Sequence, residues 1–493
     1  MIRRLLIANR GEIAVRVART AAEMGIEPVA VHSEAEAGSF HVRRIGRAVS
    51  LGAGSPRETY LSIPRILAAA RESGADAIHP GYGFLSESAE LARAVEGAGI
   101  VWVGPPPAAI EQMGDKVSAR RRAKRAGVPV VPGTNGAESS DQELLRRSKE
   151  VGFPLLVKPS AGGGGKGMAV VENAAALPAA IEQSRRVAEA AFGDGHVYLE
   201  KLLERPRHVE FQVFGDRQGN VVHLCERECS VQRRHQKVVE ETPSAALDAR
   251  LRGAMGRAAA EVARGVGYVG AGTVEFLLDE KRNFYFLEMN TRLQVEHPIT
   301  EETLGIDLVR AQLEVAAGEA LPSSWRAGKL VPRGHAIELR LYAEDPETFL
   351  PRSGRILAWE TPKGPGLRVD AGVAEGSEVG LDYDPLLAKL IAFAEDRPAA
   401  IARARRALEE WVVLGVETNH DLLRAVLASG EFESGDYSVD LVSHLPARER
   451  PKAPDAAWVA AALAFSGPAP RAGAASPAVA EPWDASTGWR AGE

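Results

Sequence analysis

The sequence predicts an α/β fold, α+β overall, in which an N-terminal doubly wound parallel sheet is followed by mixed α+β segments. In residues 1–107, short apolar runs alternate with helical stretches, as in a parallel sheet with crossover helices. After residue 153, strand-like segments follow one another more closely and are joined by polar turns. The length of 493 residues is enough for about three domains of ordinary size.

The N-terminal segment supplies the elements of the parallel sheet. Its expected strands are residues 4–8, 27–32, 75–78 and 100–103, and its expected helices are residues 12–24 and 62–73. Ser62 is a suitable N-cap for the second helix, with Pro64 in its first turn. Three successive prolines at 105–107 mark a plausible boundary.

The remaining elements are expected in a mixed order. A basic helix at 114–126 and a strand at 128–133 precede a strand, Gly-rich loop, strand, helix and strand within 153–200. Further strands are expected at 209–214, 221–226, 273–278 and 283–288, then strands from 334 onward and a helix at 398–414. Beyond residue 450 the chain is rich in Ala, Pro and Gly, which predicts a short helix at 455–465 followed by a linker.

Composition excludes several classes of protein. The 60 Lys and Arg residues against 66 Asp and Glu give a net charge of −6, which argues against a general nucleic-acid binder. Cys225 and Cys229 are too few for a disulfide framework and lack zinc-site spacing. The low cysteine count fits a reducing, cytoplasmic setting. Because no apolar run approaches the roughly 18 residues of a membrane span, we also expect a soluble protein with no membrane partner.

A glycine run is the first candidate site. Residues 157–168 read VKPSAGGGGKGM, so that four glycines lie between Lys158 and Lys166. Glycine lets backbone N–H groups approach a polyphosphate, and the lysines neutralise its charge. The segment is neither a Walker A loop nor a Rossmann fingerprint. A plain flexible turn is the alternative, and we favour phosphate binding.

Two carboxylates form the second candidate site. Two strands joined by a polar turn would bring Glu275 and Glu288 within reach of one another, among apolar neighbours. Two carboxylates with the Asn290 amide oxygen suit Mg²⁺ or Mn²⁺, which prefer oxygen ligands. The alternative is solvated hairpin charge.

Two further segments could bind an anion. Residues 290–298 read NTRLQVEHP, in which Arg292 offers an anion clamp and Glu296 a general base. Residues 226–241 read ERECSVQRRHQKVVEE and concentrate Arg233, Arg234, His235 and Lys237 just ahead of the carboxylates. A surface ion pair and a solvated charge run are the respective alternatives. The glycine-rich loop at 79–87 follows a strand, where α/β folds place ligands, whereas Cys229 is expected to be a buried, inert thiol.

Taken in order, these segments resemble biotin carboxylase, a member of the ATP-grasp superfamily and a component of acetyl-CoA and other acyl-CoA carboxylases. The similarity runs from residue 2 to about 445; residues 232–237 and the RLQVEHP run single out the biotin-dependent carboxylases. The resemblance implies an N-terminal domain at 1–113, an ATP-grasp domain at 114–330 with a mobile lid at about 131–203, and a C-terminal domain at 331–447. Residues 448–493 would be a tail or linker.

The resemblance also implies a role for each matching residue. The implied ATP contacts are Lys116, Lys158, Gly164, Gly165, Met168, Glu200, Lys201, Leu203, His208, Gln232, His235, Glu275, Leu277 and Glu288. The implied metal ligands are Glu275, Glu288 and Asn290; the bicarbonate site would comprise Lys237, Arg292, Gln294, Val295 and Glu296; and biotin would meet Tyr82 and Arg340. The implied catalytic residues are Arg292, Glu296, Lys237 and Arg340.

The implied reaction begins when Glu296 removes the bicarbonate proton and the resulting anion attacks the γ-phosphate of ATP. Metal ions, Lys158 and Lys237 would spread the developing charge. The carboxyphosphate product would collapse to CO₂ and phosphate, and Arg340 would stabilise the ureido enolate of biotin that captures CO₂. A closing lid would keep water from the intermediate.

The resemblance implies partners too. No Met-Lys pair occurs, so we expect biotin to arrive on a carrier protein or domain in trans, or the chain to be a piece of a longer subunit. A carboxyltransferase subunit and a homodimer are also implied. Residues 482–490 resemble the start of the next domain in acyl-CoA carboxylase α chains. The alternatives are the equivalent part of a pyruvate or other biotin-dependent carboxylase, another ATP-grasp ligase, and a non-catalytic nucleotide-sensing subunit.

Overall fold

The computed structural model describes residues 2–134, 140–160, 167–234, 236–326, 330–446 and 455–466. By its internal contacts the chain divides into two units, Met1–Leu445 and Pro446–Glu493. In the second unit the described segment is one helix, α17 (Asp455–Ser466), close to the helix expected there. Across these described ranges, no helix combines the length and apolar character that crossing a bilayer requires.

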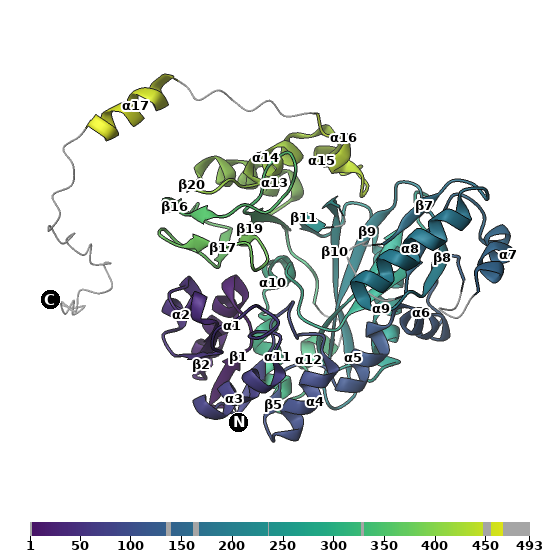
Figure 1. Ribbon diagram of the computed structural model, residues 1–493, viewed down its shortest axis with the longest axis horizontal. Coiled ribbons are helices and arrows are strands. Elements are labelled where there is room, and N and C mark those ends of the chain that lie inside the picture. The colour runs from purple at the N-terminus through teal and green to yellow at the C-terminus, as the bar shows by residue number, and fades with distance from the viewer. Residues whose placement is uncertain are drawn as a thin grey trace. The chain divides into compact units, whose positions relative to one another are not determined.

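The N-terminal sheet is parallel, as the sequence predicts (Figure 1). Its strand order is β3-β2-β1-β4-β5, built from β1 (Arg4–Ile7), β2 (Glu27–His32), β3 (Ala48–Ser50), β4 (Ala77–His79) and β5 (Val101–Trp102). The crossover helices are α1 (Gly11–Glu23), α2 (Phe40–Ile45), α3 (Ile63–Ser73) and α4 (Ala89–Gly97), with a short 3-10 turn at Glu34–Glu36. The order reverses between β1 and β4, where such folds open a crevice.

A larger antiparallel sheet carries the rest of the first unit. Its order is β13-β12-β9-β10-β11-β14-β19-β17. These strands are β9 (Arg207–Gly215), β10 (Val221–Arg233), β11 (Gln236–Thr242), β12 (Gly270–Leu278), β13 (Phe284–Asn290), β14 (His335–Tyr342), β17 (Leu367–Ala371) and β19 (Leu386–Ala394). Because β11 pairs with β14, the sheet continues without a break across residue 331.

Helices cover this sheet, and two short ribbons extend it. The helices are α5 (Pro107–Gly114), α6 (Lys116–Arg125), α9 (Ala249–Arg264), α10 (His297–Leu304), α11 (Leu308–Ala316), α12 (Ser323–Arg326), α13 (Arg397–Glu410), α14 (His420–Ala428), α15 (Gly430–Ser434) and α16 (Leu441–His444). The ribbons pair β15 (Gly354–Arg355) with β18 (Glu378–Val379), and β16 (Ala358–Glu360) with β20 (Val412–Leu414).

A third, three-stranded sheet lies between residues 140 and 201. Its order is β7-β6-β8, from β6 (Leu155–Pro159), β7 (Ala169–Val171) and β8 (Val197–Lys201), with helices α7 (Asp141–Val151) and α8 (Leu177–Phe192). It has a hydrophobic core of its own, in which Leu144, Val157 and Ile181 are buried. This separate core is what a small substructure needs in order to move as one body.

Three expected elements differ in the structure, whereas the helix expected at 114–126 is confirmed as α6 (Lys116–Arg125). Asp115 caps α6 by accepting a 2.6 Å hydrogen bond from the Ser118 amide. The strand expected at 128–133 makes only isolated bridges, since Pro129 and Pro132 have no N–H to donate. The helix expected at 398–414 stops at Glu410, and the β-branched run that follows forms β20. The strand expected at 221–226 continues to Arg233 as β10.

Substitution of Leu339 tests whether the segments before and after residue 331 unfold as one cooperative unit. Leu339 of β14 is fully buried opposite Val239 of β11. Leu339→Ala should lower the free energy of unfolding by about 2–5 kcal/mol. A double-mutant cycle with Val239→Ala should give a coupling energy of about 0.5–3 kcal/mol. Chemical denaturation measures both values.

The matched control is Leu381→Ala, because the Leu381 side chain is 63% exposed. It should change stability by no more than about 0.5 kcal/mol. Two separate unfolding transitions, with Leu339→Ala moving only one of them, would contradict a cooperative sheet.

Candidate active site

A cavity of about 850 Å³ gathers most of the residues that the sequence singled out. Its walls come from the three-stranded sheet on one side and from β9, β10, β11, β12, β13 and β14 on the other. The predicted site residues that line it are Lys116, Lys158, Met168, Glu200, Lys201, Leu203, His208, Gln232, Lys237, Glu275, Leu277, Glu288, Asn290, Arg292, Gln294, Val295 and Arg340.

The other predicted residues have different placements. Gly164, Gly165 and His235 lie outside the described residues. Glu296 is fully buried and contacts two of the lining residues, Lys237 and Arg340. Tyr82 is not among the lining residues; its backbone carbonyl accepts a 2.7 Å hydrogen bond from Asn9, at the point where the parallel sheet reverses its order.

One end of the cavity combines apolar walls with a buried ion-pair chain. Leu156 and Leu287 line it together with the predicted Leu277. Lys158 of β6 and Glu200 of β8 line the same cavity, and Lys158 donates to Glu200 at 2.6 Å. Arg120 of α6 donates to the other oxygen of the same carboxylate. Burial alone would raise the pKa of Glu200, but Lys158 and Arg120 hold it below its usual value. An apolar slot beside a fixed lysine suits a purine base and its phosphates.

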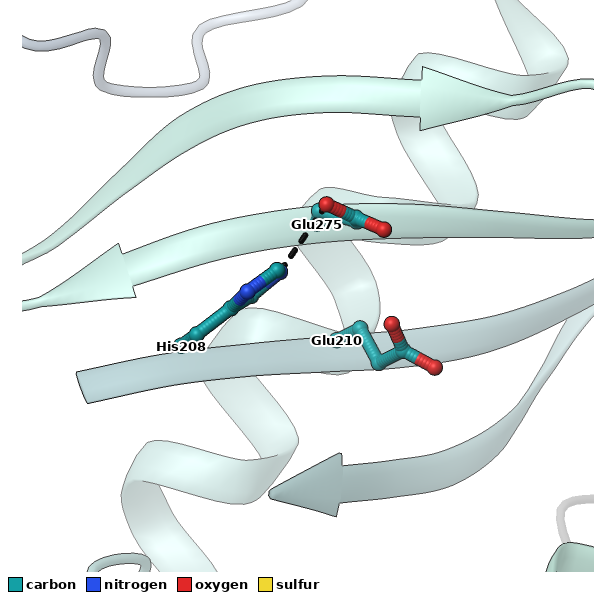
Figure 2. A group of neighbouring side chains, drawn as sticks. All are labelled: His208, Glu210 and Glu275. Atoms are coloured by element: carbon teal, nitrogen blue, oxygen red, sulfur yellow. Dashed lines mark ion pairs between the residues drawn. The ribbon is translucent and has the colours of Figure 1, made fainter. Parts of the chain in front are cut away.

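The middle of the cavity contains the predicted carboxylate pair. Glu275 of β12 and Glu288 of β13 are directly opposite in register, as the hairpin pattern predicts. Glu275 also pairs with His208 Nε2 at 2.9 Å, and these side chains lie beside Glu210 (Figure 2). Burial and the charge of Glu275 raise the pKa of Glu288. Two adjacent carboxylates, one of them resisting ionisation, are a favourable place for a divalent cation.

The donor set around this pair fits magnesium or manganese. Glu275, Glu288 and the Asn290 amide oxygen supply only oxygen ligands. The described chain also holds two closer clusters, His208–Glu210–Glu275 and Glu210–Cys229–Glu296. A cation fits those clusters poorly, because the Lys237 ammonium already lies 2.5 Å from Glu210, 3.1 Å from Glu275 and 2.6 Å from Glu296.

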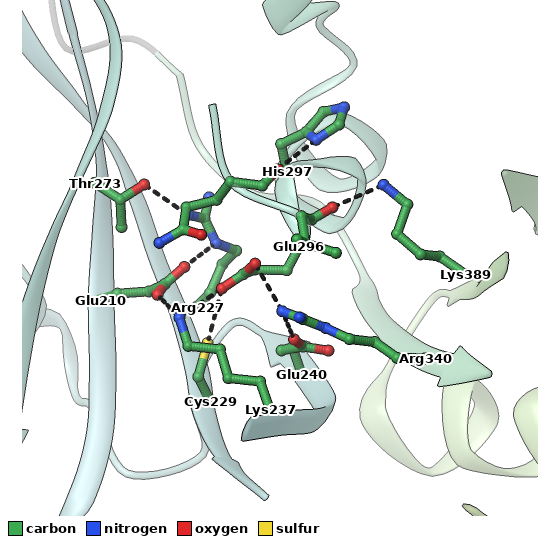
Figure 3. Close-up of polar contacts among 12 residues, drawn as sticks. Glu210, Arg227, Cys229, Lys237, Glu240, Thr273, Glu296, His297, Arg340 and Lys389 are labelled. Carbon is green, nitrogen blue, oxygen red and sulfur yellow. Dashed lines mark hydrogen bonds and ion pairs between the residues drawn. The ribbon is translucent and has the colours of Figure 1, made fainter. Parts of the chain in front are cut away.

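Buried ion pairs form the other end of the cavity (Figure 3). Glu296 bridges two cations: one carboxylate oxygen accepts from Lys237 at 2.6 Å and the other accepts from Arg340 at 2.9 Å. Arg340 also pairs with Glu240 of β11. These charges come from the hairpin β10–β11, the strand β14 and the segment before α10, so distant parts of the sequence meet here.

The charge states at this end follow from these contacts. Burial opposes ionisation of Glu296, yet Lys237, Arg340 and Arg227 hold its pKa well below the usual range. Burial opposes the charge on Lys237 too, but Glu210, Glu275 and Glu296 keep its pKa well above normal. The carboxylate and the ammonium are therefore both charged at neutral pH. Burial raises the pKa of the Cys229 thiol well above normal, as expected for an inert cysteine.

Arg292 is held ready for an anion at the edge of this group. Its guanidinium donates to Glu87 at 3.1 Å, to Asn290 at 3.0 Å and to Gln294 at 2.9 Å. The first of these acceptors is a carboxylate and the other two are neutral amides. Arg292, Lys237 and Arg340 thus bring three cationic donors to this end, beside the carboxylates that balance them, and such donors suit a small oxyanion.

Sequence reasoning missed several residues of this end. Glu210 joins Lys237 to the fully buried Arg227, at 2.5 Å from each, and Glu240 pairs with Arg340. Glu210 alternates with apolar residues on β9, whereas Arg227 and Glu240 lie next to other charged residues, and none of the three belongs to a recognisable local motif. A charged residue in a run that is otherwise apolar, as at Glu210 in HVEFQV, was the available signal.

The comparisons with known proteins agree with this arrangement. Residues 1–110 match the profile described as biotin carboxylase, N-terminal domain; residues 115–324 match carbamoyl-phosphate synthase L chain, ATP binding domain; and residues 338–444 match biotin carboxylase C-terminal domain. The chain is 47% identical over 444 residues to biotin carboxylase of Halalkalibacterium halodurans, covering 90% of this chain and 98% of that protein.

Two further relatives are parts of larger carboxylases. The mitochondrial methylcrotonoyl-CoA carboxylase subunit alpha of Rattus norvegicus is also 47% identical, but the match spans 90% of this chain and only 62% of that subunit. The biotin carboxylase domain dimer of Hydrogenobacter thermophilus 2-oxoglutarate carboxylase, solved with MgADP, ADP and bicarbonate, has a TM-score of 0.87 and 44% identity. That alignment covers 90% of this chain and 97% of the other. The chain therefore belongs to the biotin carboxylase family of ATP-dependent ligases.

Proposed function

We propose that this protein carboxylates biotin with bicarbonate at the expense of ATP, as the first half-reaction of a biotin-dependent acyl-CoA carboxylase. The observation that carries the proposal is the Lys237–Glu296–Arg340 group, in which one ionised carboxylate lies between two cations beside a cavity large enough for a nucleotide. Activation of bicarbonate requires a base, an anion site and a nucleotide in one enclosed place.

The charge pattern supports a specific order of events. While Lys237 and Arg340 are fully engaged with Glu296, the carboxylate is a weak base because its pKa is held low. A bicarbonate ion bound by Arg292 and Lys237 would draw the Lys237 ammonium away from Glu296. The pKa of Glu296 would then rise, and the carboxylate would accept the bicarbonate proton. The resulting anion would attack the γ-phosphate, forming carboxyphosphate and releasing ADP.

Other residues would hold the nucleotide and the acceptor. Lys116 and Lys158 would bind phosphate oxygens, and the apolar end of the cavity would hold the base. Glu275, Glu288 and Asn290 would hold Mg²⁺ or Mn²⁺, which neutralises phosphate charge when bound. Arg340 would hold the ureido oxygen of biotin and stabilise negative charge there. The predicted ATP contacts Gly164, Gly165 and His235 keep those proposed roles, as does Tyr82 for biotin.

The expected domain limits carry over as part of the proposal. The separate core of the three-stranded sheet supports a lid at about 131–203 within an ATP-grasp domain at 114–330. The ATP-grasp domain would lie along the chain between an N-terminal domain at 1–113 and a C-terminal domain at 331–447, with 448–493 as a tail or linker. Closure of the lid would shield carboxyphosphate from water.

The partners are proposed from the same likeness. The similarity to relatives that are named as subunits of larger carboxylases supports a biotin carrier protein or domain and a carboxyltransferase subunit as partners. The relative solved as a domain dimer supports a homodimer. A role in a pyruvate or other biotin-dependent carboxylase is the second candidate. It is supported by the structural similarity to the biotin carboxylase domain of a 2-oxoglutarate carboxylase, with a TM-score of 0.87.

Substrate dependence tests the proposal directly. ADP release, followed in a coupled assay, should require bicarbonate and be stimulated by free biotin or a biotinylated carrier. Both substrates are needed because carboxyphosphate forms only from bicarbonate and is consumed only by an acceptor. ATP hydrolysis that is indifferent to both compounds would contradict a biotin carboxylase.

Lys237→Gln tests the anion site. The substitution removes the ammonium that contacts Glu210, Glu275 and Glu296, so bicarbonate-dependent turnover should fall at least about 100-fold. ADP affinity, measured by calorimetry, should stay within about threefold. Lys149→Gln, on the exposed face of α7, is the control and should leave both values unchanged. Normal turnover in Lys237→Gln would show that the anion binds elsewhere.

Glu288→Gln tests the metal site. Loss of one carboxylate should raise the Mg²⁺ concentration for half-maximal turnover at least about tenfold, equivalent to about 1.4 kcal/mol. The matched control is Glu280→Gln in the turn of the same hairpin, where the glutamate is exposed. An unchanged Mg²⁺ requirement in Glu288→Gln would remove Glu288 from the metal site.

A further inference from the structure

A fully buried lysine outside the cavity connects three separate parts of the first unit. Lys389 of β19 is 0% exposed. Its ammonium donates a 2.8 Å hydrogen bond to the Val295 carbonyl and lies 3.1 Å from a carboxylate oxygen of Glu12 in the first turn of α1. It also lies 5.9 Å from the centre of the Tyr82 ring, within the range of a cation–π contact.

This arrangement is a poor one if stability is its only purpose. Removing an ammonium and a carboxylate from water costs several kcal/mol per ion, and an apolar pair of similar volume is often as stable. Neither oxygen of Glu12 accepts a hydrogen bond from the described residues, and burial raises the pKa of this carboxyl to about 7 despite Lys389. The well-aligned contact of Lys389 is the one to the Val295 carbonyl.

The Val295 carbonyl belongs to the segment that carries the groups proposed to activate bicarbonate. Residues 291–296 connect β13 to α10 without helix or strand structure and carry Arg292, Gln294 and Glu296. The carbonyl of Val295 is part of the peptide unit that leads into Glu296. A hydrogen bond to this oxygen therefore fixes the orientation of the peptide plane from which the Glu296 side chain departs.

Lys389 is also tied to Arg340, the second cation that contacts Glu296. The two residues are directly opposite in the antiparallel pair β14–β19, so their side chains leave the same face of the sheet. Lys389 extends from this strand towards the segment that carries Glu296 and His297 (Figure 3). One strand pair thus presents Arg340 to the carboxylate and Lys389 to the backbone beside it.

The α1 end of the contact is equally fixed. Gly372, just after β17, packs so closely on the first turn of α1 that a Cβ there would lie 2.6 Å from the Glu12 amide nitrogen. Because the first turn of α1 packs directly on this sheet, the Glu12 carboxyl is held beside Lys389. The ammonium is held from both sides, and the Val295 carbonyl is held by the ammonium.

We propose that Lys389, supported by Glu12, is a positioning residue that sets the geometry of the bicarbonate-activating segment 291–296 and of the adjoining Tyr82. This inference rests on the proposed function, since it assigns the segment a reacting anion. Lys389 acts through the Val295 carbonyl and touches no substrate. Its loss should impair bicarbonate activation and leave nucleotide binding intact.

The test variant is the double substitution Lys389→Met/Glu12→Gln. Methionine fills the space of the lysine chain, and glutamine avoids leaving Glu12 as an unpaired buried acid. We expect kcat/KM for bicarbonate to fall about 10- to 100-fold, as for a displacement of the order of 1 Å in a reacting group. The dissociation constant for ADP should change less than about threefold.

A second measurement does not depend on turnover. Hydrogen–deuterium exchange of peptides covering 291–296 should be faster in the double variant than in the unmodified protein, while peptides from β12 and β13 keep their protection. Equal exchange in 291–296 together with an unchanged kcat/KM would overturn the proposal.

The matched control is Glu226→Gln/Arg252→Met, which removes another ion pair with a fully buried carboxylate, between β10 and α9. It should leave kcat/KM for bicarbonate and exchange in 291–296 unchanged. A comparable loss in this control would show a general loosening and overturn the positioning role. If the unmodified protein shows no bicarbonate-dependent turnover, the proposed function fails instead. The exchange experiment would then still show whether Lys389 holds the segment 291–296 in place through the Val295 carbonyl.

Discussion

The site depends on the mutual neutralisation of buried charges around Glu296. A carboxylate, a lysine and an arginine, each costly to bury alone, are charged here because each lies against its opposite. Glu210, Glu240 and Arg227 extend this balance into the sheet behind the cavity. The arrangement requires that β9, β10, β11, β12 and β14 lie side by side. The charge state of the site therefore depends on the register of the large antiparallel sheet.

This dependence explains why the site is formed before substrates arrive and yet stays adjustable. In the structure, Glu296 lies beside Lys237 and Arg340, the cations that the entering anion would also meet under the proposed function. Binding would then exchange part of one set of ion pairs for another. Interactions that form fully only in the transition state would raise the rate without requiring tight binding of the anion.

Local patterns predicted much of this molecule, and non-local pairings explain what they missed. The parallel sheet and the Glu275–Glu288 opposition follow from periodicity and a short turn, and both are confirmed. The strand expected at 128–133 was wrong because the donors missing at Pro129 and Pro132 outweigh the apolar pattern. Glu210, Glu240 and Lys389 could not be assigned, because their partners lie on strands or helices far away in sequence. The resemblance named most lining residues, but it gave no reason for the buried charges behind them.

The strand pair β11–β14 also constrains how such a chain can be rearranged during evolution. Separate family profiles match the segments on either side of residue 331, which suggests interchangeable modules. Yet β11 and β14 are paired across that point, with Val239 opposite Leu339 and Glu240 opposite Glu338. Lys237, Glu240 and Arg340 all belong to these two strands. A recombinant that took β11 from one ancestor and β14 from another would split both a sheet and a charge-balanced site. Exchange at this position is therefore disfavoured unless both strands are inherited together.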